Sequence, residues 1–429
     1  MLNGKTQEVE ILTLEDCLRI GIDNNLSLEG KRKEIQRSKY GVSENRSKLL
    51  PQINAIAGYS NNFDPPVSVT DGSSYGVPYN ITQTLQHSAN AGLEMQMPLF
   101  NQTLYTSMSI AKVMEEISRL SYGKAREDVI LQISKMYYLG QVTAEQIMLI
   151  KANITRLEEL RDITQAFFDN GMSMEVDLKR VNINLENLKV QYDNAQAMMK
   201  QQLNMLKYIM DYPAEKEIAL IPVNTDSITT VALTGLSENI YELQLSQSQV
   251  QLAERQKKII TNGYIPSLSL TGSWRYAAYT DKGYHWFHSG PSNQWFRSYG
   301  VGLTLRIPIF DGLDKTYKIK KAMIDIENKR LAWEDARKNL QTQYLNAVND
   351  LMNNQRNFKK QKDNYLLAED VYAVTSDRYR EGIASMTEVL QDEMQMSEAQ
   401  NNYISAHYNY RVTNLMLLKL TGQIESLVK

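Results

Sequence analysis

The sequence is poor in cysteine, in long apolar runs and in charge of one sign. Cys17 is its single cysteine, which excludes a disulfide framework and a cysteine-based metal site. No apolar run approaches the roughly 18 residues of a transmembrane helix. A membrane β-strand gives a much weaker sequence signal, so the absence of long apolar runs does not exclude strands that cross a membrane. Lysine and arginine (47) nearly balance aspartate and glutamate (49), so we predict no nucleic-acid partner.

The residues that usually carry catalysis are also scarce. The four histidines have no nucleophile and no metal-ligand spacing around them; they are His87, His285, His288 and His407. A metal site at His285 and His288 is the weaker interpretation, because no Asp, Glu or Cys completes a ligand set there. A phosphate-binding loop and a GxSxG motif are absent. The sequence therefore predicts no catalytic residue, no cofactor and no enzyme activity.

The N-terminal stretch MLNGKTQEVEILTLEDCL lacks the basic, apolar and small-residue order of a signal peptide. Two origins remain open: a cytosolic protein, or a mature form whose signal sequence is absent and replaced by a start methionine. An acylated N-terminal cysteine would have been lost together with such a signal.

The sequence does contain a strand pattern that occurs twice. Apolar residues alternate strictly with small or polar ones from Tyr299 to Ile307, and Pro308 ends the run because it has no N–H to donate. Residues 93–97 alternate in the same way before Pro98. The two segments lie about 210 residues apart, which indicates an internal repeat.

The order of predicted elements divides the chain into two similar halves. The first repeat (12–210) is predicted to hold a helix over 12–50, a β-hairpin over 52–97 whose residues 62–86 form a loop, and two long helices that meet at a tip at 170–173. An equatorial connector (211–236) follows. The second repeat (237–423) is predicted to hold a helix over 237–260, a β-hairpin over 267–307, and two long helices that meet at a tip at 381–385.

Heptad positions of the two repeats keep a constant register. Every member of the first series is followed 211 residues later by its counterpart in the second; the pairs are Leu185 and Met396, Leu188 and Ala399, Tyr192 and Tyr403, Ala195 and Ala406, Met199 and Tyr410, and Leu206 and Leu417. Gly171 and Gly382 have the same separation. Apolar heptads indicate coiled-coil packing, so the repeat predicts a structural duplication.

Two β-hairpins cannot close a membrane barrel, which needs about eight strands, so several chains would have to combine their strands. The second hairpin is rich in aromatic residues, which suit a membrane interface; the candidates are Trp274, Tyr276, Trp295 and Tyr299. The alternative is that these aromatic side chains pack the core of a soluble sheet.

In this order of elements, with Leu50-Pro51 echoed by Ile265-Pro266 and QMPLFN echoed by RIPIFDG at 306–312, the chain resembles the TolC-type outer-membrane efflux proteins. The resemblance covers about residues 12–423. It implies an α+β membrane protein that forms a homotrimer, with a twelve-stranded outer-membrane β-barrel continued by a periplasmic α-helical barrel. Its function would be passive conduction from the periplasm or an inner-membrane pump to the exterior.

The same resemblance implies that the tips contact a periplasmic adaptor and a pump; the tip residues are Asn170, Gly171, Met172, Ser173, Glu381, Gly382, Ile383 and Ala384. Asp177 and Glu388, six residues after each tip glycine, would form acidic rings at the periplasmic entrance. They can equally be solvated helix-face acids. The basic residue that the family often has near the second tip falls at Ala384, and a second acidic position falls at Gln391. Arg378 and Arg380 are candidate substitutes.

Two other interpretations remain at this point. A soluble coiled-coil scaffold with two docking hairpins would share the heptads, and membrane fractionation distinguishes it from a channel. Met172 and Met174 at the first tip could bind Cu(I) through their thioethers, or could simply pack an irregular coiled coil.

Overall fold

The computed structural model describes residues 9–65, 67–71, 73–83, 85–222, 235–280 and 295–428. The chain packs into two units. The helical unit comprises Met1–Ile35, Ser118–Gln247 and Leu331–Lys429, and the sheet unit comprises Gln36–Ile117 and Ser248–Arg330. Each predicted repeat contributes residues to both units, so the division by packing does not follow the division by repeats. The repeat boundaries themselves stay a prediction.

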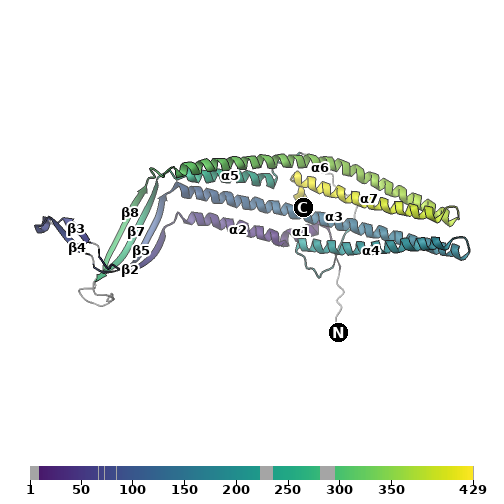
Figure 1. The fold of residues 1–429 in the computed structure, drawn as a ribbon, viewed down its shortest axis with the longest axis horizontal. Helices are drawn as coiled ribbons and strands as arrows, with labels where there is room; N and C mark the ends of the chain where they lie inside the picture. Colours follow the sequence, from purple (N-terminus) through teal and green to yellow (C-terminus); the bar gives the residue numbers. More distant parts are fainter. Residues whose placement is uncertain are drawn as a thin grey trace, which may run out of the picture. The chain divides into compact units, whose positions relative to one another are not determined.

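The sheet unit is built on four antiparallel strands in the order β2-β5-β7-β8 (Figure 1). Their bounds are Gln52–Asn61 for β2, His87–Phe100 for β5, Ser267–Thr280 for β7 and Trp295–Arg306 for β8. The four predicted strands are therefore confirmed. β5 runs beyond its predicted end at Met97, and the register shifts between Pro98 and Phe100, as expected where a residue without an N–H interrupts a ladder.

The prediction that residues 62–86 form only a loop was wrong. They contain a second, smaller hairpin of β3 (Val67–Asp71) and β4 (Tyr79–Gln83), with the 3-10 turn η1 (Ser73–Tyr75) between them. Val67 and Val69 alternate with polar residues, but the run is short and is surrounded by Pro, Gly and Ser, so composition hid it. The aromatic loop of the second hairpin, including His285 and His288, lies outside the described residues.

Four helices run from one unit into the other, and their bounds are Leu26–Ser47 for α2, Gln102–Asp169 for α3, Tyr241–Asn262 for α5 and Asp314–Arg380 for α6. α3 and α6 have 68 and 67 residues and contain no proline, as predicted. α1 (Leu14–Asn24) begins with a capping box that the Thr13 side chain and Asp16 form. In the part of the chain that the structure describes, no helix is both long enough and apolar enough to cross a membrane.

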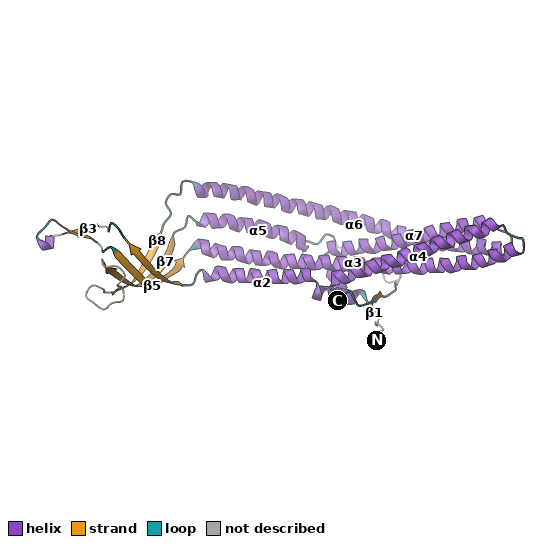
Figure 2. Ribbon diagram, turned by 60° about the horizontal axis from the view of Figure 1, so that its bottom comes forward, coloured by secondary structure: helices purple, strands orange, loops and turns teal. Residues whose placement is uncertain are grey.

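Within the helical unit, α3 turns back into α4 (Glu175–Met210), and α6 turns back into α7 (Met386–Leu420), as Figure 2 shows. A parallel pair of β1 (Glu10–Leu12) and β6 (Ile218–Leu220) and the turn η2 (Ile424–Val428) complete it. The predicted heptads supply its core: Leu185, Leu206, Met396 and Leu417 are almost fully buried. Burial of these rows drives the pairing of the helices.

Candidate functional site: the hairpin tips and the polar sheet face

The first tip is a turn that stops α3 and reverses the chain. Gly171 has φ +71°, its N–H donates to the Phe168 carbonyl (2.9 Å), and the Met172 N–H donates to the Phe167 carbonyl (2.8 Å). These two bonds form a Schellman motif, which satisfies helix carbonyls that would otherwise lack partners. Glycine is suited to this position because a side chain strains a left-handed backbone.

The second tip repeats this geometry 211 residues later. Gly382 has φ +76°, its N–H donates to the Tyr379 carbonyl (2.9 Å), and the Ile383 N–H donates to the Arg378 carbonyl (2.8 Å). The duplication predicted from sequence therefore extends to individual backbone hydrogen bonds. Both tips are well-defined turns rather than irregular loops.

Apolar side chains project from both tips. Met172, Met174 and Ile383 are each more than 60% exposed. Of the other predicted tip residues, Asn170 and Glu381 are exposed, whereas Ser173 and Ala384 are half-buried. The tips therefore offer apolar contact surface next to polar groups.

Glu388 has a local structural role in addition to any role at the entrance. Its Oε2 accepts hydrogen bonds from the Ser385 N–H (2.8 Å) and the Ser385 hydroxyl (3.2 Å), and these complete a capping box at the start of α7. The hydrogen bonds from Ser385, with a smaller contribution from Arg378, lower the pKa of the exposed Glu388 carboxyl. The carboxylate therefore stays ionised under mildly acidic conditions.

Asp177 has the matching helix position but a different environment. The residue that precedes α4 is Met174, which has no side-chain oxygen to cap the helix. Asp177 instead accepts a hydrogen bond from Arg180 (3.1 Å), and its side chain is only 15% exposed. The two acids predicted at matching positions are therefore unequal: Glu388 is exposed, and Asp177 is paired and largely covered.

The helical unit contains a buried polar network that was not predicted from the sequence. His407 is fully buried on α7; its Nε2 accepts from Arg411 Nε (3.0 Å), and its Nδ1 lies 3.4 Å from Glu145 Oε2 on α3. Tyr403 donates to the other Glu145 oxygen (3.0 Å), and burial raises the tyrosine pKa. Arg411 also donates to Gln141 (3.3 Å), and burial lowers the arginine pKa.

This network belongs to a longer polar row along α7. Glu393, Gln400, His407 and Asn414 recur every seven residues, and all are at most 8% exposed. Gln400 pairs with the buried Asn153 of α3 (2.7 Å), and burial raises the pKa of Glu393. The heptad spacing of these polar residues was the signal that could have found the row in the sequence.

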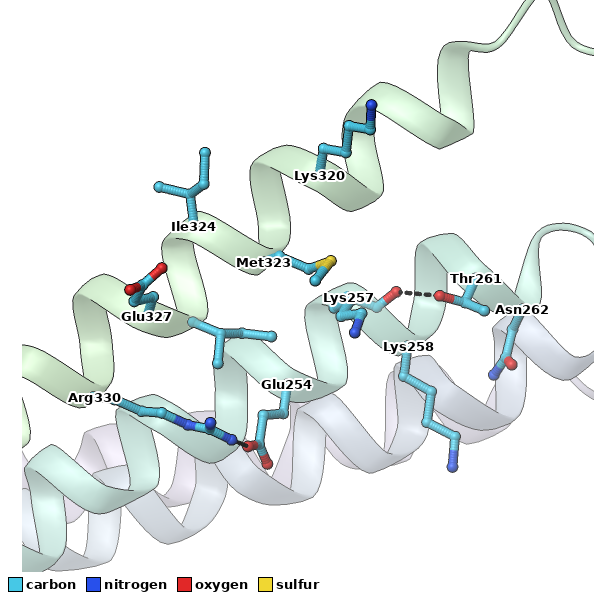
Figure 3. A pocket seen from close by; sticks show the side chains of 11 residues that line it. Glu254, Lys257, Lys258, Thr261, Asn262, Lys320, Met323, Ile324, Glu327 and Arg330 are labelled. Atoms are coloured by element: carbon cyan, nitrogen blue, oxygen red, sulfur yellow. Dashed lines mark hydrogen bonds and ion pairs between the residues drawn. The ribbon is translucent and has the colours of Figure 1, made fainter.

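A groove lies between α5 and α6 within the sheet unit (Figure 3). Its volume is about 1060 Å³, and an ion pair between Arg330 and Glu254 (2.8 Å) crosses it. Lys257, Lys258 and Lys320 give the lining more cations than carboxylates. Both members of the ion pair are exposed, so the pair itself contributes little stability.

The two faces of the four-stranded sheet differ in polarity. Strand register places Ile53, Leu93, Trp274, Tyr299, Val301 and Leu303 on one face, because residues directly opposite each other, and alternate residues along a strand, share a face. All six of these apolar side chains are more than 40% exposed. The other face has a row that crosses all four strands: Asn54, Glu94, Ser273 and Gly300.

The four predicted belt aromatics all lie on the apolar face. Trp274 is directly opposite Tyr299, Tyr276 packs edge-on against Trp274 with ring centroids 5.5 Å apart, and Trp295 is opposite Ala278 of the same face. The Arg297 guanidinium lies over the Tyr299 ring at 5.9 Å. The structure brings these aromatics together; their role as a membrane belt stays a prediction.

This duplicated arrangement, a four-stranded sheet with one apolar face joined to long paired helices, is the fold of outer-membrane efflux channels. CusC superposes with a TM-score of 0.79 at 15% identity, covering 95% of this chain and 91% of the other. The open state of the Neisseria gonorrhoeae MtrE channel gives 0.74 at 19% identity, covering 95% and 88%.

The chain belongs to the outer membrane efflux protein family, which matches residues 20–210 and 232–423. It is 21% identical to outer membrane protein TolC of Vibrio cholerae over 399 residues, 89% of this chain and 84% of that one. It is 23% identical to the toluene efflux pump outer membrane protein TtgC of Pseudomonas putida, over 95% and 82%. The TolC-type resemblance is confirmed, and the protein is an outer-membrane exit duct of an efflux system.

Proposed function

We propose that three copies of this chain form one conduit that conducts cargo passively, without catalysis. The observation that carries the proposal is the sheet order: in the described residues, β2 and β8 each pair on one side only. In hydrocarbon every unpaired backbone N–H and C=O costs several kcal/mol. Pairing β8 of one copy with β2 of the next closes a twelve-stranded barrel and removes both edges.

The exposed side of α6 supports the same assembly. Tyr317, Ile324, Leu331, Leu345 and Met352 share one heptad row, interrupted by Lys338, and all five are at least 48% exposed. A second heptad row, which includes Ile326, Leu340 and Ala347, is buried within the chain. Since a helix in a barrel wall has a neighbour on each side, the exposed row fits a helix of the adjacent copy.

The tips would contact a periplasmic adaptor and an inner-membrane pump. Supporting this, the exposed Met172, Met174 and Ile383 supply apolar anchors, and relatives such as TtgC are named as outer membrane proteins of efflux pumps. The aromatic belt would face outer-membrane lipid. Glu388, exposed and held ionised, suits an acidic ring at the entrance better than Asp177, which Arg180 neutralises.

The alternative of a soluble coiled-coil scaffold fits the sheet poorly. Its apolar face exposes Val301 (80%) and Leu303 (67%) alongside Tyr299, and a soluble protein rarely leaves such a patch in water.

The assembly is tested on the full-length protein extracted from membranes in mild detergent. We expect a heat-sensitive trimer on gels, lost in Ile324→Asp because a carboxylate then lies in the apolar row. Gln341→Asp, an exposed position of α6 outside that row, is the matched control and should stay trimeric. A monomer recovered without detergent would contradict the proposal.

A further inference from the structure

The polar face of the sheet carries an ion pair that the efflux function does not yet explain. Arg275 of β7 donates to Glu94 Oε1 of β5 across 2.7 Å, and both side chains are more than 40% exposed. They sit diagonally, since Glu94 is opposite Ser273 and Arg275 is opposite Gly92. Gly92 has no side chain, which leaves the guanidinium free to reach across to the carboxylate.

The pair borders a depression of about 490 Å³ on this face. Its lining includes Asn54, Gln96, Thr271 and Ser273, with Gly300 and Gly302 of β8 beside them. A Cβ built on Gly300 would meet nothing within 4 Å, so the surface there is open. The charges therefore stand in an accessible polar hollow and are not enclosed in a packed core.

The assignment of this face to the pore rests on the proposed trimeric conduit. In such a barrel the apolar face meets lipid and the polar face lines the lumen. Charged side chains in a lumen set ion selectivity. At distances well beyond their 2.7 Å separation the fields of the two opposite charges largely cancel, and the dipole field that remains falls off faster than that of a single charge.

We infer that Glu94 and Arg275 are selectivity-determining residues of the lumen, and that their pairing cancels their net effect on small ions. Removing either charge leaves its partner uncompensated in each of three copies. The carboxylate alone would favour cations, and the guanidinium alone would favour anions. The pair thus lets cargo of either charge sign pass the barrel.

The test is the reversal potential of the purified trimer in a planar bilayer under a KCl gradient. Glu94→Gln should shift the permeability ratio toward chloride, and Arg275→Gln should shift it toward potassium, each by roughly twofold or more. The double variant should return to the wild-type value. Arg297→Gln removes the same charge from the apolar face and should leave selectivity unchanged.

A labelling variant keeps the test independent of folding. Gly300→Cys places a thiol in the same row, and Cys17 does not compete for reagent because it is buried and burial raises its pKa to about 12. Cationic and anionic thiol reagents applied to the assembled channel should shift the reversal potential in opposite directions. A wild-type protein that never conducts would overturn the proposed conduit as well. A conducting channel whose selectivity is unmoved by these changes would overturn this inference alone.

Discussion

Arg411 donates its Nε–H to Nε2 of the buried His407 across 3.0 Å, and this contact decides which ring nitrogen carries the hydrogen. With Nε2 accepting, the neutral ring holds its hydrogen on Nδ1, which faces Glu145 Oε2 at 3.4 Å. Tyr403 satisfies the other oxygen of Glu145. His407 thus accepts from Arg411 within α7 and lies beside the Glu145 carboxylate of α3.

His407→Phe should destabilise the helical unit. Phenylalanine fills the space but removes the ring nitrogen that accepts the hydrogen bond from Arg411 Nε, at a cost of about 1–3 kcal/mol. The measurement is urea unfolding followed by helical circular dichroism. Tyr208→Phe, which alters a 77% exposed aromatic on α4, is the control and should be neutral. Equal stability of His407→Phe and wild type would show that the His407–Arg411 contact contributes no net stability.

The Asn153–Gln400 pair, which also joins α3 and α7, allows a double-mutant cycle. Asn153→Leu or Gln400→Leu alone removes one side of the buried amide pair and should cost about 1–3 kcal/mol. The double variant removes both polar groups and should recover most of that loss, because neither buried amide is then left without a partner. Simple additivity of the two losses would argue that the 2.7 Å contact contributes nothing. If polar rows specify helix register, the double variant should also show more heterogeneous packing.

Glu127 should make the folded state less stable as pH rises. Burial raises the pKa of this 4% exposed carboxyl from 4.5 to about 7. The folded chain then binds more protons than the unfolded chain between those values, so stability falls across that window and levels off above it. The contribution is at most ~3 kcal/mol. Thermal unfolding of wild type and Glu127→Gln should converge near pH 4.5 and separate by pH 8, with the variant more stable; parallel curves would refute this.

Substitutions at Ser385 and Glu388 distinguish the capping role of the second tip from the effect of its charge. Ser385→Ala removes the capping hydroxyl and should cost about 1 kcal/mol while keeping the carboxylate. Glu388→Gln keeps the capping box, since Gln serves equally well there, but removes the charge. We expect the first to change thermal stability only and the second to reduce cation preference in bilayers. A Glu388→Gln channel with wild-type selectivity would leave Glu388 as a cap alone.

Single cysteines test the tips against the adaptor. Ile383→Cys and Met172→Cys carry the only reactive thiol, because Cys17 is buried. A short thiol crosslinker in intact cells should capture the adaptor from both tips. Tyr208→Cys, equally exposed but away from the tips, should not. Capture from Tyr208→Cys alone would show that the adaptor contacts a part of the chain other than the tips.

Much of the fold could be predicted because it follows from local rules. Pro51, the alternation in β8 and the heptads of α4 and α7 each fix one element, and the constant 211-residue register links them into repeats. Gly171 and Gly382 were found for the same reason: only a left-handed turn needs glycine there.

The parts that could not be predicted depend on distant partners. β1 has three residues and is a strand only because β6 lies beside it, more than 200 residues on. Glu393 and His407 look like solvated helix residues until α3 and α6 pack against α7. The inequality of Asp177 and Glu388 follows from Met174 and Ser385, whose side chains differ in their ability to cap a helix.

The most direct test of the central claim is single-channel recording of the purified full-length oligomer in a planar bilayer. An exit duct formed by three copies predicts discrete, uniform conductance steps that appear with the trimer and disappear with Ile324→Asp. A trimer that inserts into the bilayer yet gives no conductance, or steps that persist unchanged in the monomeric variant, would contradict it.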